Sequence, residues 1–237
     1  MTHVDLNLLA LDTSTDQLSV AVQRADGQRF AHTGAGGAQA SASLIPAVQA
    51  LLAQAGLSLS DLSAIAFGRG PGSFTGLRTA CSVAQGLAWG AGVPVLPIDT
   101  LLAVAEAARS AHGPTHVLAL LDARMNEVYA AEYAWRDAAG WRPLSDIAVL
   151  APEAVPTPGA GAVLAGNAFA AYADRLPAAL QALPRIAALP SADALLNLAP
   201  ALLAAGAAVP AEQALPLYIR DKVAQTTAER SAAGLAR

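Results

Sequence analysis

The sequence predicts an α/β fold of two related units, each with a mixed sheet flanked by helices. The first observation is an apolar run ending in an acid at Leu8–Asp12, followed by the alternating strand pattern of Leu18–Gln23. The second is an echo of this pattern, because Val117–Asp122 is again apolar with a terminal acid and a strand follows at Glu127–Trp135. The third is a strand at Ala64–Gly68 that runs through a glycine-rich loop into a helix.

The first strands are predicted to form an antiparallel meander. Asp12–Thr15 joins the first two strands as a turn, and Ala25–Gly27 is a hairpin signal before a third strand at Arg29–Thr33. The small residues of Gly34–Ala42 then predict a flexible connection.

Three helices are predicted in the first unit. The apolar residues of Ser43–Ala55 share one helical face, and Pro46 is expected in the first turn, where a missing N–H costs little. A second helix is predicted over Phe74–Trp89, a strand over Val93–Ile98 and a third helix over Thr100–Ser110.

The second unit begins after a break at His112–Pro114. We expect an exposed loop at Pro152–Gly161, a short strand at Ala162–Gly166, a helix at Ala192–Ala205 and a frayed polar tail at Gln225–Arg237. The predicted division is an N-terminal lobe over residues 1–105, a smaller C-terminal lobe over 106–205, and a segment over 206–237 that packs back on the first lobe.

Composition narrows the function classes. The 237 residues suit one large or two small domains, and the net charge of −4 without a basic patch argues against direct binding of nucleic acid. The single cysteine, Cys81, excludes an intrachain disulfide and fits a reducing cytoplasm. The N-terminus lacks the basic flank of a signal peptide. Glycine and proline interrupt the apolar stretches Thr79–Ile98 and Ala194–Ala211, so no membrane span is expected.

The acid-led turn Asp12–Thr15 is the first candidate site. It resembles the opening of actin/hexokinase/Hsp70-like (ribonuclease H-like) folds, in which this turn approaches nucleotide phosphates and the acid organises a metal. Those families place a glycine inside the turn, where this sequence has Thr13 and Ser14. The alternative is a strand turn in which Ser and Thr bond to the backbone.

The glycine-rich run Gly68–Thr79 (GRGPGSFTGLRT) is the most specific motif. Ser73 is placed to cap the following helix, whose free N–H groups could hold an anion. The run is neither a Walker loop nor a dinucleotide fingerprint. It resembles, almost residue for residue, an element of the TsaB (YeaZ-type) proteins of bacterial tRNA threonylcarbamoyladenosine biosynthesis.

Three further elements resemble the same family in the same order. They are Leu120–Tyr129 (LLDARMNEVY), Val163–Asn167 (VLAGN) and Leu215–Val223 (LPLYIRDKV). The resemblance therefore covers most of the chain and implies a two-lobed actin-like fold. It also implies a vestigial nucleotide site with Asp12, Thr13, Ser14, Thr15 and Asp122 as its residues; no cofactor is firmly implied, and weak binding of ATP or ADP at a partner interface stays open.

Candidate catalytic groups are few. The related catalytic family TsaD carries two metal-binding histidines on one helix, whereas the comparable helix Thr100–Ser110 has none. His112 and His116 have i, i+4 spacing, but Gly and Pro between them argue against a continuous helix, so no metal site is expected. Cys81 reads as a packed thiol, and Ser73 lacks the flanking glycines of a nucleophile elbow.

The resemblance implies a non-catalytic subunit that binds and activates a TsaD homologue, with the ATPase TsaE joining the assembly and tRNA contacted only indirectly. A homodimer is expected when the chain is alone. The two Ala-rich helices are expected to form the interface, through Leu44, Val48, Leu51, Phe74, Leu77, Cys81 and Ala84. Two alternatives stay open, an actin-superfamily small-molecule kinase or ATPase and a metal-dependent peptidase-like protein.

Overall fold

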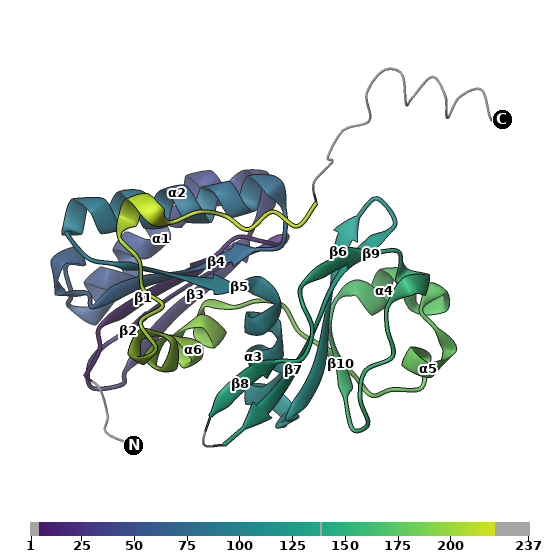
Figure 1. Ribbon diagram of the computed structural model, residues 1–237. Coiled ribbons are helices and arrows are strands. Elements are labelled where there is room, and N and C mark those ends of the chain that lie inside the picture. Colours follow the sequence, from purple (N-terminus) through teal and green to yellow (C-terminus); the bar gives the residue numbers. More distant parts are fainter. Residues whose placement is uncertain (1–4, 138, 221–237) are drawn as a thin grey trace, which may run out of the picture.

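The computed structural model describes residues 5–137 and 139–220, which form two lobes, each built on one sheet (Figure 1). The first sheet has the strand order β3-β2-β1-β4-β5. Its first three strands are antiparallel, whereas β1, β4 and β5 run parallel. The strands are β1 (Leu8–Asp12), β2 (Gln17–Gln23), β3 (Arg29–Ala35), β4 (Ala64–Gly70) and β5 (Val95–Asp99).

Helices cover both faces of the first sheet. α1 (Ala40–Ala55) and α2 (Phe74–Ala91) share a buried apolar cluster with one face of the sheet. α6 (Ala192–Ala204) packs on the other face, beside α3 (Thr100–His112). α3 also packs against the second sheet, so this helix lies between the two lobes.

The second sheet has the order β11-β10-β6-β7-β8, with β9 paired to β7. β6, β7 and β8 are antiparallel, and β10 runs parallel to β6 and β11. The elements of this lobe are β6 (His116–Arg124), β7 (Glu127–Arg136), β8 (Gly140–Pro143), β9 (Ala148–Leu150), β10 (Val163–Gly166), α4 (Ala168–Tyr172), α5 (Ala178–Gln181) and β11 (Arg185–Ala187). Short 3-10 helices lie at Gly37–Gln39, Leu59–Asp61, Pro152–Ala154, Ala173–Arg175 and Ala211–Gln213.

The predicted fold class is confirmed, because two mixed sheets flanked by helices form two lobes. Each predicted strand is present with both ends within two residues of those expected. The acid-ended strands β1 and β6 also occupy equivalent places, since each pairs antiparallel with the strand after it and parallel with a later one.

The segment Gly34–Ala42 is more regular than predicted. β3 runs to Ala35, a 3-10 turn follows and α1 already begins at Ala40. Ala40 and Leu44 are both buried, so the packing face of the helix starts one turn early. Pro46 therefore lies inside the helix rather than in its first turn.

The boundary between the lobes also differs from the prediction. α6, expected in the second lobe, buries Leu195, Leu196 and Ala199 in one cluster with Leu8 and Ala10 of the first sheet. The chain therefore returns to the first lobe before residue 205. Beyond α6, Val209 and Val95 exchange two backbone hydrogen bonds at the edge of the first sheet.

The apolar stretch Thr79–Ile98 falls on α2 and β5, and most of Ala194–Ala211 falls on α6. Across residues 5–137 and 139–220, no helix has the length and apolar character needed to cross a bilayer. The predicted tail Gln225–Arg237 and the last residues of the motif Leu215–Val223 lie outside the described residues.

Candidate functional site

The turn after β1 satisfies its own polar groups. The backbone N–H and the hydroxyl of Ser14 both donate to Oδ1 of Asp12, at 2.9 and 2.7 Å. The N–H of Gln17 donates to Oγ1 of Thr15 at 3.2 Å. These contacts are those of a hydrogen-bonded strand turn, so they favour that interpretation over a phosphate loop with free N–H groups.

The glycine-rich loop packs directly on this turn. The N–H of Ser73 donates to the carbonyl of Ser14 at 2.7 Å, and the hydroxyl of Thr13 donates to the carbonyl of Gly76 at 2.7 Å. A Cβ on Gly72 would lie 2.6 Å from the Ser14 carbonyl oxygen. Glycine is therefore needed here for close packing of two backbone segments, which explains the motif without a ligand.

Asp12 is enclosed between these segments. Its side chain is buried, and Oδ2 has no hydrogen-bond partner among the described residues. Burial raises the pKa of this carboxyl group above its ordinary value, and the two hydrogen bonds from Ser14 only partly oppose that shift. Asp12 thus lies under the turn and does not reach its open surface.

The start of α2 is capped within the loop. Oγ of Ser73 accepts from the N–H of Gly76 at 3.5 Å, and the Ser73 carbonyl accepts from Leu77 at 2.8 Å. The predicted N-cap role of Ser73 is confirmed.

The equivalent turn of the second lobe has an unusual backbone. Arg124, Met125 and Asn126 have φ values of 58°, 56° and 63°, in the left-handed region that side chains other than glycine rarely adopt. Oδ1 of Asp122 accepts from the N–H of Arg124 at 2.7 Å and from the hydroxyl of Tyr172 at 2.9 Å. Asp122 is therefore occupied by groups of its own lobe.

A C-terminal strap, defined as Leu217–Arg220, crosses from one lobe to the other. The N–H of Leu217 donates to the carbonyl of Arg69 at the end of β4, at 2.7 Å. Tyr218 packs 5.5 Å from the ring of Phe74 and accepts a hydrogen bond from Arg78. In the second lobe, Arg220 donates to the carbonyl of Ala123 and to Glu127.

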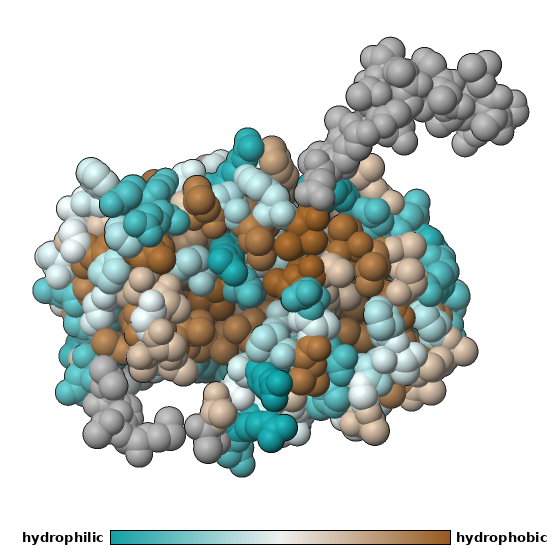
Figure 2. Space-filling model, in the orientation of Figure 1, coloured by the Kyte–Doolittle hydropathy of each residue, from teal (hydrophilic) through white to brown (hydrophobic). Residues whose placement is uncertain are grey.

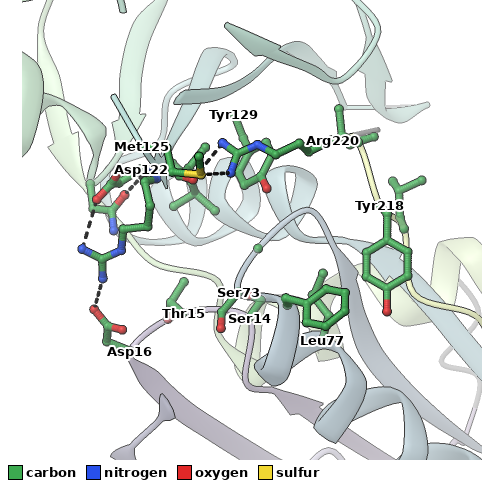
Figure 3. Close-up of a pocket in the computed structure, with 18 residues that line it drawn as sticks. Ser14, Thr15, Asp16, Ser73, Leu77, Asp122, Met125, Tyr129, Tyr218 and Arg220 are labelled. Atoms are coloured by element: carbon green, nitrogen blue, oxygen red, sulfur yellow. Dashed lines mark hydrogen bonds and ion pairs between the residues drawn. The ribbon is translucent and has the colours of Figure 1, made fainter. Parts of the chain in front are cut away.

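These four segments enclose a cleft of about 290 Å³ between the lobes (Figure 3). An ion pair between Arg124 and Asp16, at 2.7 Å, joins the lobes across it. Figure 2 shows apolar side chains gathered where the lobes meet, beside the point where the described chain ends. The cleft is lined by Ser14, Thr15, Asp16, Gly72, Ser73, Phe74, Leu77, Leu121, Asp122, Ala123, Arg124, Met125, Tyr129, Asn167, Leu217, Tyr218, Ile219 and Arg220.

The structure brings Ser14, Thr15 and Asp122 of the predicted site together in this cleft, whereas Asp12 and Thr13 are buried beneath it. Sequence reasoning did not assign Arg124 and Arg220 to the site. Both lie in motifs that were recognised as family markers, so the signal was present, but no spacing rule joins positions so far apart in the chain.

The predicted interface residues have a different place. All but Phe74 are at most 5% exposed: Leu44, Val48, Leu51, Cys81 and Ala84 belong to the core beneath α1 and α2, and the buried Leu77 borders the cleft. The prediction is wrong for these six, because the apolar stripe of each helix covers the chain's own sheet. Phe74 alone among the seven is exposed, at 48%.

His112 and His116 lie on different elements, and His116 and Cys81 have structural contacts. His112 is the last residue of α3 and His116 the first of β6, where its Nε2 lies 2.6 Å from Glu132. Sγ of the buried Cys81 donates to the carbonyl of Ala214 at 3.4 Å, and burial raises the pKa of its thiol. Within the described ranges, no group of three or more His, Cys, Asp or Glu side chains could hold a metal ion.

Comparison with known proteins places this geometry in a family. A family model described as "TsaD: tRNA N6-adenosine threonylcarbamoyltransferase" matches residues 31–228. The Escherichia coli tRNA threonylcarbamoyladenosine biosynthesis protein TsaB is 38% identical over 224 residues, which cover 92% of this chain and 96% of that protein. The Haemophilus influenzae TsaB protein is 47% identical over 125 residues, or 53% of this chain and 52% of that one.

A solved structure agrees over nearly the whole fold. YeaZ from Pseudomonas aeruginosa superposes with a TM-score of 0.84 and 42% identity, covering 90% of this chain and 99% of the other. A sequence relative and a solved structure, each matched over nearly its whole length, therefore coincide with the motifs described above. The chain belongs to the TsaB family of tRNA threonylcarbamoyladenosine biosynthesis proteins.

Proposed function

We propose that the chain is a non-catalytic subunit that binds a TsaD homologue and activates it for threonylcarbamoyl transfer to tRNA. The observation that carries the proposal is the occupation of the nucleotide-type turn by the chain's own loop. The N–H of Ser73 donates to the carbonyl of Ser14, while the carboxylate of Asp12 accepts hydrogen bonds from Ser14 itself. In this state the Ser14 N–H is already donated to Asp12, so it is not free to bind a phosphate.

The acid of the second lobe supports the same proposal. Asp122 accepts from Arg124 and Tyr172, and an ion pair with the Arg124 guanidinium at 3.3 Å neutralises its charge. A carboxylate held in this way has fewer lone pairs free for a metal ion. We infer that neither lobe supplies the paired acids of an actin-type ATPase, and that any bound ATP or ADP would sit at the boundary with a partner.

The surface proposed for TsaD is the outer helix face, defined as the exposed residues Ala42, Ile45, Gln49 and Ala53 of α1 and Arg78, Ser82, Gly86 and Trp89 of α2. The two helices lie side by side on the first lobe (Figure 1). Four of these eight residues are Ala, Ser or Gly, so a partner helix could approach closely at their positions, because the distance between packed helices depends on the side chains at the contact. Trp89, at 71% exposure, offers a large apolar anchor at its end.

Reconstitution tests the proposed activity. Purified TsaD and TsaE homologues, ATP, threonine, bicarbonate and tRNA are combined with and without this chain, and modified adenosine is quantified by mass spectrometry. We expect modification to depend on the chain, and we expect the chain alone to show no ATP turnover. Equal modification without the chain would overturn the proposal.

A surface variant tests the proposed contact. Gly86→Arg places a long side chain on the outer helix face at a position where added atoms meet nothing within 4 Å. We expect the folded variant to lose binding to TsaD by calorimetry and to lose activation. Ala179→Arg, on an exposed residue of α5 in the second lobe, is the matched control and should bind normally. Normal binding by Gly86→Arg would place the interface elsewhere.

The remaining parts of the proposal concern the assembly of the complex and the cellular compartment in which it acts. We propose that TsaE joins the complex of the two other proteins, that tRNA contacts this chain only indirectly, and that the whole acts in the cytoplasm. In the absence of TsaD, the same outer helix face would pair with that of a second copy, because a self-complementary patch forms a two-fold dimer. Gly86→Arg should then also shift the isolated chain from dimer to monomer in sedimentation.

A further inference from the structure

A buried carboxylate lies away from the cleft, on the helix between the lobes. Glu106 of α3 is 1% exposed. Within its own helix it accepts from Nε and Nη2 of Arg109, at 2.9 and 3.1 Å, and from the hydroxyl of Ser110 at 2.9 Å. A buried charge needs such partners, since removing a carboxylate from water is costly.

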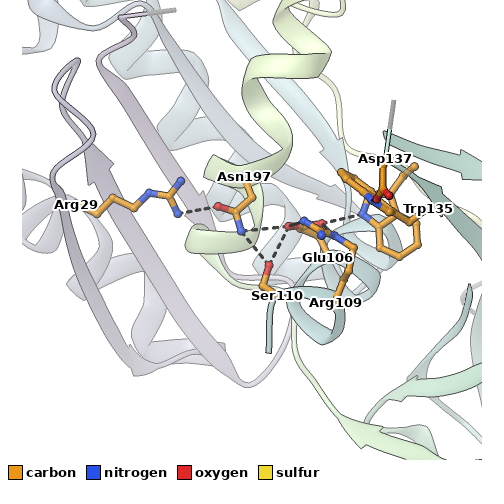
Figure 4. Close-up of polar contacts among 8 residues, drawn as sticks. Arg29, Glu106, Arg109, Ser110, Trp135, Asp137 and Asn197 are labelled. Atoms are coloured by element: carbon orange, nitrogen blue, oxygen red, sulfur yellow. Dashed lines mark hydrogen bonds and ion pairs between the residues drawn. The ribbon is translucent and has the colours of Figure 1, made fainter. Parts of the chain in front are cut away.

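Two further donors reach Glu106 from different lobes (Figure 4). From the second lobe, Nε1 of Trp141 on β8 donates at 2.8 Å. From α6, which packs on the first sheet, Nδ2 of Asn197 donates at 3.2 Å and also reaches Ser110 at 3.0 Å. Arg29 of β3 in turn donates to Oδ1 of Asn197 at 2.8 Å, which extends the network into the first sheet.

The other end of the network is also anchored. The Arg109 guanidinium lies 3.9 Å over the ring of Trp135 on β7, a cation–π contact. The rings of Trp135 and Trp141 meet edge to face at 5.6 Å. We call this set the Glu106 network: Arg29, Glu106, Arg109, Ser110, Trp135, Trp141 and Asn197. It spans β3, α6, α3, β7 and β8, and so both lobes.

The hydrogen bonds of Glu106 add a directional constraint to the junction between the lobes, which apolar packing does not supply. Leu101 and Val104 of α3 pack against the second sheet, and Ala103 packs against the first. Such contacts are non-directional, so they specify the orientation of the lobes less sharply than hydrogen bonds do. The Glu106 carboxylate, by contrast, is satisfied in one arrangement, and a shift of either lobe would strip a donor from a buried charge.

We propose that Glu106 fixes the angle between the two lobes, so that the chain behaves as one rigid body and its cleft neither opens nor closes. Trp141 donates to Glu106 from the second lobe, and Asn197 donates to it from α6 on the first lobe. The proposal rests on the network alone and does not depend on which partner the chain binds.

Measured distances between the two lobes test whether Glu106 fixes the angle between them. Spin labels are placed at His32→Cys on β3 and Ala179→Cys on α5, two exposed positions in different lobes, in a Cys81→Ala background. Pulsed electron paramagnetic resonance then gives the distribution of distances. We expect one narrow peak for the parent chain and a broadened or shifted distribution for Glu106→Ala.

Milder variants keep the test decisive if Glu106→Ala does not fold. Trp141→Phe replaces the indole with a smaller ring that has no N–H donor, and Asn197→Ala removes the amide; each should broaden the distribution while circular dichroism stays unchanged. The matched control is Glu153→Ala, because the paired contacts of Glu153 with Arg175, at 2.6 and 3.1 Å, lie within the second lobe. Parent-like distributions in folded Trp141→Phe and Asn197→Ala would overturn the proposal.

Discussion

The carboxyl group of Asp12 lies directly against Gly68 on the neighbouring strand. A Cβ at position 68 would stand 1.8 Å from Oδ2 and 2.9 Å from Cγ of Asp12, but an ordinary 3.6 Å from its Cβ. The acid that ends β1 and the glycine of β4 are thus one packing unit. This contact joins the two most prominent motifs of the sequence.

This unit predicts a strong coupling between the two positions. Gly68→Ala should lower the free energy of unfolding by about 1–3 kcal/mol or more, as overpacking does in a filled core. In an Asp12→Ala background the same change should cost much less, since the clashing atoms are gone. Urea unfolding of the four proteins of this double-mutant cycle measures the coupling. Additive effects would contradict the contact.

Two glycines of α2 predict opposite effects of one substitution. A Cβ on Gly76 would lie 1.8 Å from the carbonyl oxygen of Thr13, a backbone atom that cannot rotate away, so Gly76→Ala should destabilise the protein by about 1–3 kcal/mol. A Cβ on Gly86 meets nothing within 4 Å, so Gly86→Ala should stabilise by up to about 1 kcal/mol through helix propensity. Thermal unfolding of both variants checks the pair, and a shift of the same sign in both would refute it.

The raised pKa of Asp12 predicts a dependence of stability on pH. In the unfolded chain this carboxyl loses its proton near 3.8, whereas in the folded chain burial holds the proton to higher pH. Between these values unfolding releases a proton, so the contribution of Asp12 to stability falls as pH rises, by at most about 1.4 kcal/mol per pH unit.

Asp12→Asn removes this titration. Parent and variant are unfolded in urea at a series of pH values from 3.5 upward. The stability of the parent relative to the variant should decline with rising pH and then level off above the folded pKa. A difference that stays constant with pH would show that the carboxyl is not protonated in the fold.

The order of strands and helices could be predicted because it depends on local patterns. Alternation at Leu18–Gln23 marks a strand, although both faces of β2 are buried, and the apolar stripe of α1 reports which side of that helix is buried. The same patterns misled the interface prediction, since Leu44 and Leu77 are apolar for the sake of the chain's own core. Periodicity reveals a buried face but not what buries it.

The site could be predicted only in part, for a related reason. The turn Asp12–Thr15 and Asp122 were found as strand ends, which the local sequence marks. Arg220 meets Glu127 across 93 residues, and Glu106 meets Asn197 across 91, through contacts that depend on how the lobes pack. No local pattern encodes such distances.

The last prediction separates two arginines that border the cleft. Arg124 pairs with Asp16 between the lobes, but both side chains are largely exposed, at 69% and 86%. Arg220 is mostly buried, and it donates to the carbonyl of Ala123 and to Glu127 while its Nη1 lies 3.2 Å from the sulfur of Met125. An exposed pair is worth about 0–1 kcal/mol, whereas removing one partner of a buried charge costs more.

Arg124→Ala should therefore change the free energy of unfolding by less than about 1 kcal/mol, and Arg220→Ala should lower it by about 3 kcal/mol. Arg220 also holds both flanks of the turn in which Arg124, Met125 and Asn126 have positive φ, and such backbone persists only where its surroundings impose it. Hydrogen exchange at residues 123–127 should accelerate in Arg220→Ala and stay slow in Arg124→Ala. Equal exchange in the two variants would mean that the turn holds its shape without the strap.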